Sequence, residues 1–114
     1  MHELAVCQGL LRQVERVAAD NGARSVERIL LRVGALSGVE PPLLERAFEI
    51  ARMGTLAEGA ELHIDSGPVV VKCRQCGASS AVLPNRLLCG QCGAWQVNVT
   101  EGDELLLLSV DLTM

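Results

Sequence analysis

Apolar residues recur at helical spacing in two segments of the chain. In residues 3–20 they lie three or four positions apart, at Leu4, Cys7, Leu10, Leu11, Val14, Val17 and Ala18. This spacing predicts an amphipathic helix, with Asn21-Gly22 as its stop signal. A second apolar stripe follows Pro41-Pro42, a pair that suits the first turn of a helix, and this helix is expected to end near Met53-Gly54.

Three further segments, residues 26–33, 60–66 and 104–112, show a period of two instead. Such alternation is typical of strands with one better buried face. The last segment is expected to bury one face made of Leu106, Leu108, Val110 and Leu112. If the first two strands pair in parallel, the helix between them forms a right-handed crossover. The order of elements predicts an α+β fold with two helices and a small three-stranded mixed sheet.

Residues 69–99 have a different composition. They are rich in cysteine and glycine and lack long periodic segments, so they cannot bury much core of their own. Ser66-Gly67-Pro68 and Glu101-Gly102-Asp103 border this stretch. We therefore predict an α/β domain of residues 1–68, completed by residues 101–114, and an inserted module of residues 69–100.

The composition narrows the function classes. The 114 residues carry a net charge of −4 and only two aromatic side chains, Phe48 and Trp95. Nucleic-acid binding through stacked bases and a clustered basic surface is therefore disfavoured. No apolar run exceeds four residues, and the first 20 residues carry several charges. The sequence predicts neither a targeting signal nor a membrane span, and we expect a cytoplasmic protein.

Four of the five cysteines form two Cys-x-x-Cys pairs, each followed by glycine. The pairs are Cys73/Cys76 and Cys89/Cys92, with twelve residues between them. In a reducing compartment this spacing favours a metal site over disulfides. Two such turns can close a tetrahedral four-sulfur site with no position left for water, which predicts a structural Zn(II) in a zinc-ribbon-like module. An iron-sulfur centre, a redox dithiol and four unrelated cysteines are the alternatives.

The chain begins Met1-His2-Glu3, and these residues offer a second set of metal ligands. The α-amine of Met1, the amide nitrogen of His2 and its imidazole can close fused chelate rings. Square-planar nitrogen ligation of this kind favours Ni(II) or Cu(II) over Zn(II). A solvated helix start, with Glu3 near the positive end of the helix, accounts for the same residues without a metal.

Three motifs in the same order resemble the HypA/HybF family of hydrogenase-maturation nickel metallochaperones. They are Met1-His2-Glu3-Leu4, the Val-Gly-Ala-Leu-Ser-Gly-Val-Glu-Pro stretch at residues 33–41, and the double Cys-x-x-Cys module. The resemblance covers essentially the whole chain. It implies a non-enzymatic carrier of Ni(II), with a maturation GTPase and the hydrogenase large-subunit precursor as partners, and urease maturation in some organisms. A monomer or weak dimer is expected.

The resemblance also assigns ligands. Nickel falls to Met1, His2 and Glu3, and zinc to the four paired cysteines, Cys73, Cys76, Cys89 and Cys92. Glu40 is a further candidate oxygen ligand for nickel, or simply the residue that starts the helix before Pro41. Ala35 departs from the family pattern, because many members carry Glu there. The alternative function is a zinc-ribbon module that binds protein or nucleic acid without nickel, and a redox enzyme comes third.

Three other residues have simpler interpretations. His63 alternates with apolar neighbours and should lie on the polar face of the sheet as an ordinary surface histidine. Cys7 lies on the apolar stripe of the first helix and is expected to be a small buried side chain, with a stray metal ligand as the alternative. Trp95 follows the last cysteine and is expected to cover the zinc module, with partner binding as the alternative.

Overall fold

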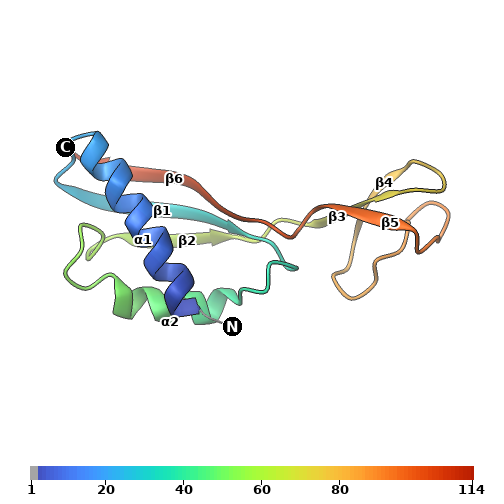
Figure 1. The fold of residues 1–114 in the computed structure, drawn as a ribbon, viewed down its shortest axis with the longest axis horizontal. Helices are drawn as coiled ribbons and strands as arrows, with labels where there is room; N and C mark the ends of the chain where they lie inside the picture. Colours follow the sequence, from blue (N-terminus) through green and yellow to red (C-terminus); the bar gives the residue numbers. More distant parts are fainter. Residues whose placement is uncertain (1–2) are drawn as a thin grey trace. The chain divides into compact units, whose positions relative to one another are not determined.

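The computed structural model describes residues 3–114, which form two compact units. The first unit contains the described residues up to Arg32 together with Val39–Asp65 and Leu106–Met114. The second contains Val33–Gly38 and Ser66–Leu105. Figure 1 shows both helices in the first unit, with each unit built around its own small sheet.

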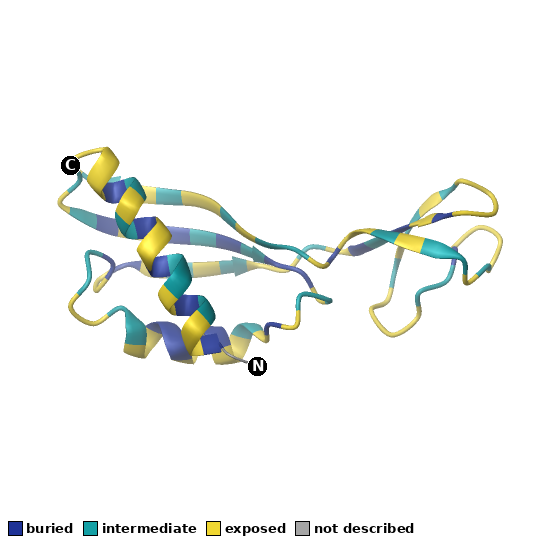
Figure 2. Cartoon of the chain, viewed as in Figure 1, coloured by how far each residue is buried: buried dark blue, intermediate teal, exposed yellow. Residues whose placement is uncertain are grey.

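Two helices form one layer of the first unit. Helix α1 spans Glu3–Asp20 and helix α2 spans Pro41–Ala51, close to the predicted ranges. The apolar residues that they bury follow the helical period, and they are Cys7, Leu11, Val14 and Ala18 on α1 and Leu44, Ala47 and Phe48 on α2. Figure 2 shows these buried positions as repeated bands along one side of each helix, so amphipathic packing stabilises both.

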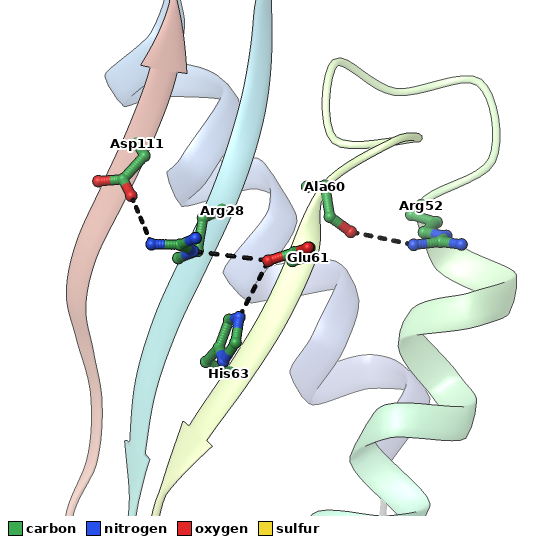
Figure 3. Close-up of polar contacts among 6 residues, drawn as sticks. All are labelled: Arg28, Arg52, Ala60, Glu61, His63 and Asp111. Atoms are coloured by element: carbon green, nitrogen blue, oxygen red, sulfur yellow. Dashed lines mark hydrogen bonds and ion pairs between the residues drawn. The ribbon is translucent and has the colours of Figure 1, made fainter.

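The three strands of the first sheet are β1 (Ser25–Val33), β2 (Glu61–Asp65) and β6 (Leu105–Thr113), in the order β2-β1-β6. Strands β1 and β2 pair in parallel, with Arg28 opposite Glu61 and Arg32 opposite Asp65. A parallel pair needs a crossover, and α2 lies in that connection. Figure 3 shows β6 running in the opposite direction to β2. The sheet is therefore mixed, as predicted.

One face of this sheet packs against the helices. Side chains from both helices and from two of the three strands line a shared apolar space, including Val14 of α1, Ile29 of β1, Leu44 of α2 and Leu62 of β2. The other face carries Arg28 and its neighbours and has no helix over it (Figure 3).

The prediction for the last strand is wrong in its first half. Leu106 and Leu108 are 47% and 41% exposed, whereas Leu105 and Leu107 are half-buried. Further along β6, Val110 is half-buried as predicted. The two consecutive exposed residues Leu108 and Ser109 shift the alternation by one position, which a strict period of two cannot reveal.

The second unit contains three strands that the sequence did not predict. They are β3 (Val69–Cys73), β4 (Ser79–Val82) and β5 (Val97–Glu101), in the antiparallel order β4-β3-β5. The central strand β3 buries Val69 and Val71, while the register against β5 shifts between Val70 and Val71. These short strands hold the two cysteine pairs in place.

Two chain segments of the second unit cross at glycines. The Gly34 N–H donates to the Glu104 carbonyl, and the Leu36 N–H donates to the Gly102 carbonyl at 2.7 Å. A Cβ on Gly34 would overlap the Gly102 carbonyl. Gly102 itself has a φ of +117°, a region that favours glycine. Only glycine at both positions allows this close crossing.

Candidate metal centres

The four paired cysteines come together in space. Their sulfur atoms all lie within 4.8 Å of one another. Two contacts join the two motifs: Cys73 Sγ lies 3.6 Å from Cys92 Sγ, and Cys76 Sγ lies 3.5 Å from Cys89 Sγ. We call these four residues the cysteine cluster. Among the described residues it is the one group of three or more Cys, His, Asp or Glu side chains arranged to hold an ion.

Each cysteine pair forms the same tight turn, or knuckle. The Gly77 N–H donates to the Cys73 carbonyl at 3.1 Å, and the Gly93 N–H donates to the Cys89 carbonyl at 3.0 Å. Gly77 and Gly93 have φ values of +77° and +76°, which explains why glycine follows each pair. The two turns thus aim their sulfurs at one point from opposite sides.

Backbone N–H groups stabilise the first sulfur of each knuckle as a thiolate. The N–H groups of Gln75 and Cys76 donate to Cys73 Sγ at 3.3 and 3.4 Å. In the second knuckle, the N–H groups of Gln91 and Cys92 donate to Cys89 Sγ at the same two distances. The pKa of the Cys89 thiol is lowered to about 6, mainly because the Cys92 N–H donates a hydrogen bond to its sulfur. The pKa of Cys73 is lowered by the equivalent bond from Cys76. Such sulfurs are prepared to bind a metal.

The other two thiols behave differently. The Ala94 N–H lowers the pKa of Cys92, but the neighbouring Cys73 thiol and burial outweigh it, and the pKa rises to about 12. The pKa of Cys76 is also raised, since the Cys89 sulfur beside it and burial outweigh a backbone hydrogen bond from Ala78. Four adjacent thiolates repel one another, so losing all four protons requires a cation among them.

The cluster fits a tetrahedral ion. Zinc–sulfur bonds of about 2.3 Å in a tetrahedron separate neighbouring sulfurs by about 3.8 Å. The cross-knuckle separations of 3.5 and 3.6 Å in the structure are close to that edge. Four protein sulfurs fill every position of such a site, which is the ligand set of structural zinc.

The predicted nickel ligands are only partly described. Met1 and His2 lie outside the described residues. Glu3 is the first residue of α1 and is 7% exposed. Glu40 precedes α2, where its carbonyl accepts bonds from Leu43 and Leu44, but its side chain makes no capping hydrogen bond. The structure therefore places two of the four candidates at helix starts.

His63 lies on the open face of the first sheet, as predicted. Its Nε2 is 3.2 Å from a carboxylate oxygen of Glu61, which also lies 3.6 Å from Arg28 Nε (Figure 3). Arg28 in turn pairs with Asp111 of β6 at 3.6 Å. The hydrogen bond from His63 and the charge of Arg28 lower the pKa of Glu61. These exposed polar contacts connect side chains of all three strands. In the sequence, only the alternation of polar positions indicated them.

The remaining cysteine is buried, as predicted. Cys7 is 2% exposed on α1, and burial raises the pKa of its thiol to about 11. It lies among apolar side chains that include Leu11 and Phe48. A neutral thiol in such a place acts as a small apolar group.

Trp95 does not cover the zinc module, so that prediction is wrong. Its side chain is 70% exposed. In the same segment, the Ala94 carbonyl accepts from the Cys89 N–H and the Trp95 carbonyl accepts from the Val97 N–H. The backbone thus closes the second knuckle without the indole. Single exposed apolar residues are common and imply no function by themselves.

No helix in residues 3–114 combines the length and the apolar character that crossing a membrane requires.

The two-helix α+β unit and the four-thiolate centre define a class of small metalloproteins with a knuckle-type metal module. A family model described as "Hydrogenase/urease nickel incorporation, metallochaperone, hypA" matches residues 1–112. The chain belongs to this HypA family of nickel metallochaperones, which act in hydrogenase maturation, and the resemblance seen in the sequence is confirmed.

Relatives and solved structures agree with this assignment. A hydrogenase maturation factor HypA from Nitrosospira multiformis is 48% identical over 112 residues, covering 98% of this chain and 97% of the relative. The one from Aquifex aeolicus is 39% identical over the same length, covering 98% of this chain and 97% of the relative. The solution structure of the Ni metallochaperone HypA from Helicobacter pylori matches with a TM-score of 0.73 and 30% identity, covering 99% of this chain and 98% of that chain. The predicted fold class is thereby confirmed.

Proposed function

We propose that this chain binds Ni(II) at its amino terminus and delivers it during hydrogenase maturation, while the cysteine cluster holds a structural Zn(II). The observation that carries the proposal is the family match, which begins at residue 1 and so includes the Met1-His2-Glu3 motif. The domain of residues 1–68 and 101–114 would carry nickel, and residues 69–100 would form the zinc-binding module.

The proposed nickel site uses nitrogen ligands. The Met1 amine, the His2 amide and the His2 imidazole form the chelate, and Glu3 completes the motif. Square-planar nitrogen sites suit Ni(II). Glu40 is proposed as an additional oxygen ligand, because its carboxylate is not used to cap α2.

Zinc is proposed for the cysteine cluster on the chemistry of its donors. Four sulfurs within 4.8 Å of one another, two of them already polarised by N–H groups, satisfy a divalent ion without water. Zinc bound in this way stabilises the module and performs no chemistry. We accordingly propose a protein without enzymatic activity of its own.

The proposed setting follows from membership in the family. Family membership implies that the chain works with the hydrogenase maturation machinery. Within that machinery, we propose a maturation GTPase and the hydrogenase large-subunit precursor as its specific partners. We propose a cytoplasmic location and no role for nucleic acid or membrane. The net charge of −4 supports the exclusion of nucleic acid.

A titration with matched histidine variants tests the nickel site. Zinc-loaded protein should bind one equivalent of Ni(II) and develop d-d absorption bands of a square-planar complex. His2→Ala should abolish this binding and leave one equivalent of zinc. His63→Ala should change neither, since His63 lies on the open face of the sheet and bonds to Glu61. Nickel binding that survives His2→Ala but disappears in His63→Ala would contradict the proposal.

A further inference from the structure

The cysteine cluster combines sulfurs of different access to solvent. Cys73 and Cys89, the first cysteines of the two knuckles, are buried, whereas Cys76 and Cys92 are exposed. Oxidation of a cysteine by small molecules follows its exposure and its thiolate character. A zinc site with four covered sulfurs would resist such oxidants, but half of this ligand set is open to solvent.

Each exposed sulfur lies against a buried sulfur of the other knuckle. Cys92 Sγ is 3.6 Å from Cys73 Sγ, and Cys76 Sγ is 3.5 Å from Cys89 Sγ. A disulfide bond is about 2.05 Å long, so each pair has to close by only about 1.5 Å. Backbone N–H groups hold both buried sulfurs in place. An exposed cysteine beside a second thiol that can resolve it is a common arrangement in redox sensors.

The charges of the module favour reaction at these sulfurs. Residues 69–100 contain Lys72, Arg74 and Arg86 and no acidic side chain. Arg86 lines the same surface hollow as Cys89. Cationic neighbours stabilise thiolates, and no carboxylate of this stretch opposes them. Cys7 differs in both respects, because it is buried among apolar side chains.

We propose that the cysteine cluster is also a hydroperoxide-sensitive switch, in which two disulfides between the knuckles replace the bound zinc. The disulfide pairs are Cys73 with Cys92 and Cys76 with Cys89. This inference rests on the proposed zinc site, since a bound divalent ion keeps all four sulfurs as thiolates at neutral pH. It gives that site a second state, in which covalent bonds join the knuckles instead of a metal.

Two molecules of hydrogen peroxide complete the conversion. The Cys92 thiolate attacks one peroxide oxygen, so an S–O bond forms, the O–O bond breaks, and the departing hydroxide takes a solvent proton to become water. The Cys73 thiolate then attacks the Cys92 sulfur, so the S–S bond forms and the S–O bond breaks. The second hydroxide also leaves as water after protonation. Cys76 and Cys89 repeat both steps, so four thiolates lose four electrons to two peroxides, and Zn(II) is released without a change of oxidation state.

The pairing of the cysteines decides whether the switch is readily reversed. Four cysteines allow three pairings. Disulfides within the knuckles would close rings of four residues and leave the knuckles unconnected. The cross-knuckle pairs instead keep the four sulfurs together after the metal has left. Reduction then returns the complete ligand set.

Oxidation of the zinc-loaded protein with hydrogen peroxide tests the switch. Two equivalents of peroxide should release one equivalent of zinc, read with a chromogenic chelator. Dithiothreitol and added Zn(II) should restore one equivalent of bound zinc. Dimedone, which traps sulfenic acids, should label Cys76 and Cys92 when it is present during oxidation, and should leave Cys73 and Cys89 unlabelled.

Peptide mapping tests the pairing. Trypsin cleavage at the three basic residues of the module places Cys73 and Cys76 on two separate peptides and Cys89 with Cys92 on a third. The predicted disulfides link all three peptides, and fragment ions should join Cys92 to Cys73. Disulfides within single knuckles would link only the first two peptides.

The matched control is Cys7→Ala, which removes the buried thiol outside the cluster and should change neither the zinc stoichiometry nor the pairing. Zinc that stays bound under excess peroxide would overturn the switch. So would disulfides within single knuckles, or sulfinic acids at the exposed cysteines without any disulfide. A protein that holds no zinc before peroxide is added would contradict the proposed zinc site, and the switch with it.

Discussion

Replacing Cys89 by serine should unfold the zinc module and spare the helical unit. Between Val69 and Val99 the buried residues are Val69, Val71, Cys73 and Cys89. Burying the two valines contributes about 3–6 kcal/mol together. Zinc binding to modules of this size contributes on the order of 10–16 kcal/mol at neutral pH. The proposed zinc would therefore be the dominant stabilising term, and a serine hydroxyl is a poor substitute for a thiolate.

Two readouts separate the units in this variant. Both helices, of 18 and 11 residues, belong to the first unit, so the helical circular dichroism signal should be retained. Lys72, Arg74 and Arg86 are trypsin sites within the second unit. Cleavage at these three sites, mapped by mass spectrometry, should accelerate at least tenfold.

The control variant is Cys7→Ala, which removes a buried thiol of the first unit and should leave cleavage in the zinc module unchanged. Full loss of the helical signal in Cys89→Ser would refute the division into separately stable units. Unchanged proteolysis would refute the dependence of the module on its metal.

Three further predictions concern single positions. Because the pKa of buried Cys7 is about 11, its contribution to stability is complete below pH 9 and is lost as pH rises from 9 to 11. Urea midpoints should therefore fall over this range by the equivalent of at most about 2.7 kcal/mol, and less steeply in Cys7→Ala. Gly34→Ala should destabilise its unit by about 1–3 kcal/mol in thermal melts, since its Cβ overlaps a backbone carbonyl, whereas Gly59→Ala has open space and should be neutral. Nickel affinity should decrease from pH 7 to pH 6 in competition titrations, because protons compete for the Met1 amine and the His2 imidazole, whose unperturbed pKa values are about 8 and 6.5.

Much of the first unit could be predicted from periodicity. The apolar stripe of residues 3–20 and the Asn21-Gly22 stop matched α1 closely, because one face of that helix is buried against a single layer. The sequence left the pairing direction of the first two strands open, and the structure shows that β1 and β2 pair in parallel with α2 between them. The phase of β6 did not follow, because an edge strand is held on one side only and can change its alternation, as it does at Leu108 and Ser109.

The second unit was harder to predict, and the reason lies in what stabilises it. Its strands have four or five residues, too few to show a period, and they are arranged around the cysteine cluster rather than around an apolar core. Cysteine spacing therefore predicted which four side chains come together without predicting the strands of the unit. Trp95 was misplaced for the same reason, since a module with two buried valines has no interior large enough for an indole.

The most direct test of the central claim is a nickel titration of zinc-loaded protein carrying two extra residues, Gly-Ser, before Met1. The extension keeps every side chain but moves the terminal amine out of the chelate. We predict that specific nickel binding and its d-d bands disappear while zinc remains at one equivalent, and that a tag placed after Met114 has no effect. If the extended protein still binds one nickel with unchanged affinity and spectrum, the metal is not held at the amino terminus.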